Sequence, residues 1–172
     1  MAVSTFDARY KAFPVCSILN MPAIVHANRT GRARRRSIPI YESSSAMRIL
    51  IADDHETIRK GICTILTAHF DLRSEDCVEA SNGHEAIQKA VALKPDVIIL
   101  DINMPVLDGF GAAHEIHRLL PGIPILFFTM HTGDQIVLEA RKAGVQGFVT
   151  KDRAGEVLVD AVNALLRNET YF

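Results

Sequence analysis

Three acidic residues, each placed directly after a short apolar run, are the side chains best suited to chemistry. Asp53 and Asp54 follow residues 48–52, and Asp101 follows the Val-Ile-Ile-Leu run at 97–100. Carboxylates that meet in one crevice repel one another and raise one another's pKa values, so a compensating cation is expected. Mg²⁺ meets this requirement, because it prefers oxygen ligands from one or two carboxylates together with water and phosphate.

Two further polar residues end apolar runs nearer the C-terminus. Thr129 ends residues 125–129, and Lys151 ends residues 147–151. A metal ion, an ammonium group, a hydroxyl and backbone N–H groups together suit a phosphoryl group, whose charge is spread over its oxygens. One carboxylate can then act as a nucleophile and form an aspartyl phosphate. Asp101 is the best candidate, because it stands alone after the central strand and a turn leaves it open.

The elements predicted around these residues explain why the side chains would meet. Apolar runs indicate strands at 48–52, 75–80, 97–101, 125–129 and 147–151. Amphipathic patterns indicate helices at 56–70, 82–93, 109–120, 134–143 and 156–167. Five alternations of strand and helix predict an α/β fold, with a parallel sheet, right-handed crossovers and helices on both faces. The carboxyl ends of the strands then share one edge, where open α/β sheets bind their ligands.

The composition divides the chain of 172 residues into two unlike parts. Residues 1–46 carry seven basic and two acidic side chains, whereas residues 47–172 carry twelve basic and eighteen acidic ones. The first part contains three prolines and has no sustained period, so we expect a disordered basic extension, with Met47 as an alternative start of translation. No apolar run is long enough for a membrane span.

Residues 47–172 resemble the receiver domain of response regulators in two-component signalling. The matching motifs are Ile-Ala-Asp-Asp-His at 51–55, Pro-Asp-Val-Ile-Ile-Leu-Asp-Ile-Asn-Met-Pro-Val-Leu-Asp-Gly at 95–109, Phe-Phe-Thr at 127–129, and Gly-Val-Gln-Gly-Phe-Val-Thr-Lys at 144–151. Each motif is weak alone, but their order and their positions at strand ends make the set specific. The resemblance implies a flavodoxin-like, doubly wound, five-stranded parallel sheet of order 2-1-3-4-5 with five helices.

The resemblance also implies a role for each site residue. Asp101 would accept a phosphoryl group from a sensor histidine kinase or a phosphotransfer protein, and Thr129 and Lys151 would contact that group. Mg²⁺ would be held by Asp53, Asp54, Asp101 and the backbone carbonyl of Asn103. Phe148 matches the aromatic switch residue of the family, although ordinary strand packing explains this residue equally well.

Finer matches at 53–55, 58–61 and 151–152 resemble receivers attached to LuxR-type helix-turn-helix domains. No such domain follows in this sequence, and two interpretations are open. In the first, the chain is a cytoplasmic phosphoacceptor that is not an enzyme, although it assists its own phosphorylation and dephosphorylation. It would act on an unidentified effector without binding DNA or membranes, and phosphorylation could promote a homodimer. In the second, the chain is the remnant of a DNA-binding transcriptional regulator that has lost its helix-turn-helix domain.

Two rival functions come from other classes of protein. A metal-dependent phosphatase of the aspartyl-phosphate type usually needs a second Asp two residues after the nucleophile, and this position holds Asn103. A nucleic-acid-binding module could use the arginines at 32–36, but the net negative charge of residues 47–172 disfavours it.

Overall fold

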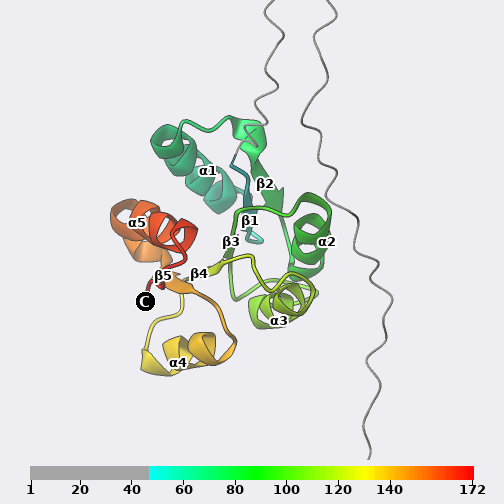
Figure 1. Ribbon diagram of the computed structural model, residues 1–172. Helices are drawn as coiled ribbons and strands as arrows, with labels where there is room; N and C mark the ends of the chain where they lie inside the picture. Colours follow the sequence, from blue (N-terminus) through cyan, green and yellow to red (C-terminus); the bar gives the residue numbers. More distant parts are fainter. Residues whose placement is uncertain (1–46) are drawn as a thin grey trace, which may run out of the picture. The chain divides into compact units, whose positions relative to one another are not determined.

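A parallel sheet organises the part of the chain that the computed structural model describes, residues 47–172. Its strands are β1 (Ile49–Ala52), β2 (Cys77–Ala80), β3 (Val97–Leu100), β4 (Ile125–Thr129) and β5 (Gly147–Thr150). They lie in the order β2-β1-β3-β4-β5 (Figure 1), which confirms the predicted topology. The predictions about residues 1–46 fall outside the described residues.

Five helices cover the two faces of this sheet. They are α1 (Glu56–Phe70), α2 (Gly83–Leu93), α3 (Gly109–Leu119), α4 (Asp134–Lys142) and α5 (Ala154–Leu166). Helices α1 and α5 lie on one face, and α2, α3 and α4 lie on the other (Figure 1). Within residues 47–172, no helix is both long enough and apolar enough to cross a membrane.

The central strands are buried on both faces, as their unbroken apolar runs predict. In β1, Ile49 and Ile51 belong to the core under α1 and α5, whereas Leu50 and Ala52 belong to the core under α2, α3 and α4. Successive side chains of a strand point to opposite faces, so one short strand supplies both cores. The two cores hold the strand ends in a common register, and this positions the polar residues that follow them.

Most predicted elements differ from the observed ones by one or two residues at an end, as at α5, which begins at Ala154 and not at residue 156. Two of these differences have clear local reasons. The expected strand at 75–80 begins at Cys77, because Ser74–Asp76 forms a 3₁₀ turn. The Asp76 carboxylate accepts a hydrogen bond from the backbone N–H of Arg73 at 2.9 Å, which stabilises that turn. The expected strand at 147–151 ends one residue earlier, because Lys151–Arg153 is a second 3₁₀ turn that leads into α5.

Two side chains satisfy backbone N–H groups at the start of α2. The Asn82 side chain accepts a hydrogen bond from the backbone N–H of Glu85 at 2.9 Å, as a helix cap does. The Glu85 carboxylate, however, accepts from the backbone N–H of Ser81 at 2.8 Å instead of from that of Asn82. The start of α2 is thus closed by the side chains of Asn82 and Glu85, one accepting from within the helix and the other from the residue before the cap.

Candidate functional site

Two buried carboxylates lie side by side at the carboxyl edge of the sheet. Ala52 pairs with Leu100 across β1 and β3, so the next residues, Asp53 and Asp101, lie on neighbouring strands. The backbone N–H of Asp101 donates to the carbonyl of Ala52 at 2.8 Å, which holds the two strand ends together. Asp53 is 1% exposed and Asp101 is 4% exposed. Burial of two like charges so close together requires a compensating cation.

Lys151 supplies a positive charge to both carboxylates. Its Nζ lies 2.6 Å from Oδ2 of Asp53 and 2.8 Å from Oδ2 of Asp101, and its side chain is only 7% exposed. Burial by itself would lower the pKa of this ammonium, but its hydrogen bond to Asp101, its close contact with Asp53 and the charges of both carboxylates outweigh that effect. The pKa of Lys151 therefore lies above its ordinary value, and the group is an ammonium at neutral pH.

Asp53 retains an unused acceptor for a further cation. Its Oδ1 accepts a hydrogen bond from the backbone N–H of His55 at 2.9 Å. Its Oδ2 is buried, and within residues 47–172 it has no hydrogen bond of acceptable geometry, although the Lys151 ammonium lies 2.6 Å away and forms an ion pair with it. A hard divalent cation satisfies such a carboxylate oxygen, so the donor set fits Mg²⁺.

Asp54 and His55 extend this group towards solvent. The Asp54 side chain is 35% exposed, and its Oδ1 lies 2.7 Å from Nδ1 of His55. One ligand atom each of Asp53, Asp54 and His55 lies within 4.8 Å of the others. Asp101 is joined to this group through Lys151 and is not one of its three members. His55 belongs to a matching motif, but the resemblance gives it no role at the metal site.

Thr129 and Asn103 lie at the rim of the same edge and share His131 as a partner. The Oγ1 of Thr129 accepts a hydrogen bond from the backbone N–H of His131 at 3.2 Å. The Nδ2 of Asn103 lies 2.6 Å from Nε2 of His131, so a side-chain contact bridges the loops that follow β3 and β4. Among residues 47–172, no hydrogen bond joins Thr129 to Asp101 or to Lys151.

The loop after β3 is held close to Asp101 by tight backbone packing. The N–H of Gly109 donates to the carbonyl of Ile102 at 2.8 Å, and a β-carbon at position 109 would lie 2.2 Å from the carbonyl oxygen of Asp101. Glycine is therefore required here for the close approach of two backbone segments. In the same loop, Val106 has a φ of 69° and is 83% exposed, an unusual conformation for a β-branched residue.

The comparisons with known proteins agree with this architecture. A family model, the response regulator receiver domain, matches residues 49–163. The chain belongs to this family.

Relatives of this receiver domain include a curated protein and several solved structures. This chain is 37% identical over 126 residues to the response regulator protein VraR of Staphylococcus aureus. The match covers 73% of this chain and 59% of VraR. A LuxR-family two-component response regulator from Aurantimonas sp. SI85-9A1 has a TM-score of 0.66 at 30% identity, over 73% of this chain and 88% of that one. The isolated receiver of RcsB from Salmonella enterica serovar Typhimurium, solved with the phosphomimetic BeF₃⁻, has a TM-score of 0.63 at 27% identity. The match covers 72% of this chain and 91% of the RcsB receiver.

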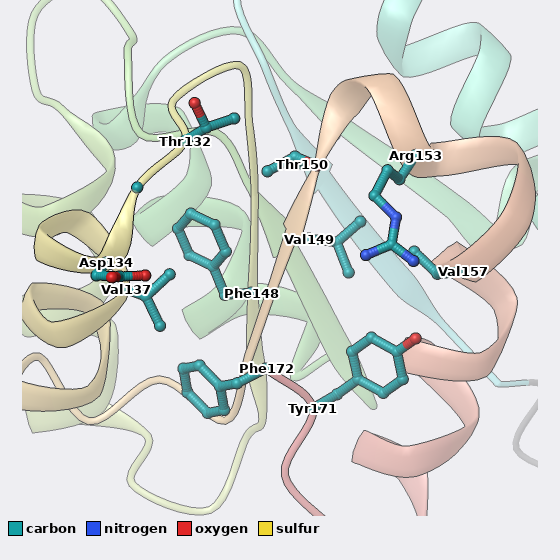
Figure 2. A pocket seen from close by; sticks show the side chains of 11 residues that line it. Thr132, Asp134, Val137, Phe148, Val149, Thr150, Arg153, Val157, Tyr171 and Phe172 are labelled. Atoms are coloured by element: carbon teal, nitrogen blue, oxygen red, sulfur yellow. The ribbon is translucent and has the colours of Figure 1, made fainter.

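Phe148 lies in a different environment from the buried carboxylates Asp53 and Asp101. The residue is only 7% exposed and belongs to the core under α2, α3 and α4. It also lines a pocket of about 260 Å³ between α4, β5, α5 and the last residues of the chain (Figure 2). None of Asp53, Asp101 and Lys151 lines that pocket. The switch role and the packing role of Phe148 are both compatible with this position.

Sequence reasoning placed the predicted residues at the correct strand ends but did not find all of their contacts. It did not predict that Lys151 contacts Asp53 as well as Asp101. It also missed the Asn103–His131 contact, although each of these residues comes two positions after a strand-end residue, Asp101 or Thr129. That shared spacing is a signal from which the contact could have been inferred.

Proposed function

We propose that this receiver domain accepts one phosphoryl group on Asp101, with Mg²⁺, and changes a protein-binding surface in response. The observation that carries the proposal is the buried Asp101 carboxylate, whose Oδ2 is held by the same ammonium that is ion-paired with the buried Oδ2 of Asp53. A cluster of two buried acids and one lysine is costly to bury, and such clusters concentrate at functional sites.

The arrangement suits nucleophilic attack by a carboxylate on phosphorus. Oδ1 of Asp101 accepts the backbone N–H of Ile102 at 2.8 Å, and Oδ2 accepts from Lys151. These bonds hold the carboxylate in one orientation while an oxygen forms the new bond to phosphorus and the bond to the donor breaks. Lys151 can then follow the negative charge onto the phosphoryl oxygens, and the Thr129 hydroxyl can donate to one of them.

Mg²⁺ would be held by Asp53, Asp54, Asp101 and the backbone carbonyl of Asn103. The ion would neutralise the negative charge that accumulates on the transferred group. His55, which lies against Asp54, lines the solvent side of this site. The buried Oδ2 of Asp53 supports this assignment, because it is an anionic oxygen ion-paired with Lys151 and has acceptor capacity left for a metal ion.

The partners follow from the same chemistry. The phosphodonor would be a sensor histidine kinase or a phosphotransfer protein in the cytoplasm, and the effector that reads the phosphorylated state is unidentified. The chain would act as a phosphoacceptor and not as an enzyme that turns over a substrate, and phosphorylation could promote a homodimer. The chain spans 57% to 59% of the length of the curated relatives, so the activities of those longer proteins are not assigned to it. None of these findings favours the interpretation as a remnant of a DNA-binding regulator over a phosphoacceptor.

Intact-mass measurement after incubation with a small phosphodonor and Mg²⁺ tests the proposal. The wild-type protein should gain the mass of one phosphoryl group, and Asp101→Asn should gain none. Asp160→Asn, which changes an exposed carboxylate on α5, is the matched control and should be labelled like the wild type. Labelling of Asp101→Asn, or labelling that persists unchanged in EDTA, would contradict the proposal.

A further inference from the structure

The last residues of the chain lie along the outer edge of β5 and make one isolated parallel bridge to it. We call residues 169–172 the C-terminal strap. Asn168, with a φ of 59°, turns the chain after α5, and Tyr171 then pairs in parallel with Gly147. The N–H of Tyr171 donates to the carbonyl of Gln146 at 2.9 Å, and the N–H of Phe148 donates to the carbonyl of Tyr171 at 2.8 Å.

The C-terminal strap contacts both helical layers, because neighbouring side chains of a strand point to opposite faces. Tyr171 packs against the core under α1 and α5. The ring of Phe172 lies on the other side, where the guanidinium carbon of Arg141 in α4 is 3.7 Å from its centroid. Figure 2 shows Tyr171 on the side of Arg153 and Val157, and Phe172 on the side of Phe148. The strap thus joins α4 to α5 across the edge of the sheet.

Helix α4 has few other anchors. Ala140 is the only buried residue of this helix, and Leu138 is 47% exposed. Ile136 and Val137 pack against the core while partly buried, and the cation–π contact between Arg141 and Phe172 adds to these contacts at the end of α4. A shift of α4 would remove the cation–π contact and leave the strap with its two backbone hydrogen bonds to β5 and the packing of Tyr171.

A continuous set of contacts connects the acidic edge to the strap. Thr129 holds the backbone N–H of His131, in the loop that leads into α4. Lys151 follows β5 directly, and the N–H of Phe148 within β5 is bonded to the strap. A phosphoryl group that attracts the Thr129 hydroxyl and the Lys151 ammonium would therefore disturb both supports of the strap, α4 and β5.

We propose that the C-terminal strap is a displaceable segment, which covers the outer edge of β5 in the unphosphorylated protein and is released when Asp101 is phosphorylated. This inference rests on the proposed function, because phosphorylation of Asp101 supplies the trigger. Release uncovers the backbone edge of β5 and the pocket beside Phe148, and a strand edge of this kind can pair with another extended segment.

Amide hydrogen exchange of the full chain, followed by NMR, tests this inference. The amides of Phe148 and Tyr171 report on the strap directly, and Val149, which the register places opposite Phe128 in β4, is the internal control. Beryllium fluoride with Mg²⁺ is the phosphoryl mimic, and its binding is read independently by ¹⁹F NMR. Since each bond contributes modestly to stability, loss of both should accelerate exchange of the two reporters about ten-fold or more, with Val149 unchanged.

The possible outcomes separate the two proposals. A bound mimic with faster exchange at both reporters supports release of the strap. A bound mimic with unchanged or slower exchange overturns the inference and leaves the proposed function intact. If the wild type, like Asp101→Asn, binds no mimic, the proposed function fails and the coupling fails with it.

A second pair of variants tests the anchor in the absence of the mimic. Phe172→Ala should accelerate exchange of the Phe148 and Tyr171 amides about two- to five-fold, because it removes the cation–π contact with Arg141. Lys142→Ala changes the exposed neighbouring cation of α4 and should leave both amides as in the wild type. If the Phe148 and Tyr171 amides exchange at the same rates in Phe172→Ala and Lys142→Ala, Phe172 is not an anchor of the strap.

Discussion

Replacement of Lys151 by Met should destabilise the metal-free protein strongly at neutral pH. The variant keeps the length of the side chain but removes the ammonium from Asp53 and Asp101, which are 2.6 and 2.8 Å away and nearly fully buried. Removing one partner of a buried ion pair typically costs about 3–5 kcal/mol. The variant has one way to limit this loss, which is to protonate one of the two carboxylates.

The protonation route sets the expected pH dependence. Protonating a carboxyl group of ordinary pKa costs about 4 kcal/mol at pH 7 and about 2 kcal/mol at pH 5.5. The free energy of unfolding of Lys151→Met should therefore be about 3–4 kcal/mol below that of the wild type at pH 7. The difference should shrink by about 2 kcal/mol at pH 5.5. Because the pKa of Lys151 is raised in the folded protein, the contribution of its ammonium to the free energy of unfolding is fully present below about pH 10.4. That contribution is lost only as the pH rises through the raised pKa. The change between pH 5.5 and 7 thus reports on the carboxylates.

Urea unfolding of the full chain in EDTA, at both pH values, measures these differences. Lys142→Met removes an exposed lysine of α4 and is the control, for which a change of a few tenths of a kcal/mol is expected. The reasoning is refuted if Lys151→Met loses less than about 1 kcal/mol at pH 7, or if its loss is the same at pH 5.5.

Two further predictions concern the backbone around Asp101 and are also read by urea unfolding. Val106→Asn should stabilise the protein by about 1 kcal/mol, because asparagine adopts a positive φ more readily than a β-branched residue; an equal or lower stability would contradict the strain at this position. Gly109→Ala should destabilise by about 1–3 kcal/mol and reduce phosphorylation, since its β-carbon would clash with the carbonyl of Asp101. Gly61→Ala is the control, because no atom lies within 4 Å of the new β-carbon, and it should stabilise α1 by about 0.5–1 kcal/mol. If Gly61→Ala and Gly109→Ala change the stability by similar amounts, the predicted clash at position 109 is wrong.

The fold could be predicted from the sequence because its determinants are local and periodic. Unbroken apolar runs, such as Val97–Leu100, indicate strands buried on both faces, and the amphipathic segments between them indicate the covering helices. The same runs also end at identifiable polar residues, so Asp53, Asp101 and Lys151 could be assigned to one edge of the sheet before any distance was known.

The tertiary structure alone decided which of these residues touch. The sequence places Lys151 fifty positions after Asp101, and no periodicity indicates that one ammonium serves both this carboxylate and Asp53. The C-terminal strap is a similar case, because residues 169–172 carry no strand pattern of their own and lie beside β5 where the preceding helix, α5, places them. A repeating pattern records which face of an element is buried, whereas contacts between distant residues depend on the register and packing of whole elements, which no local segment of the chain contains.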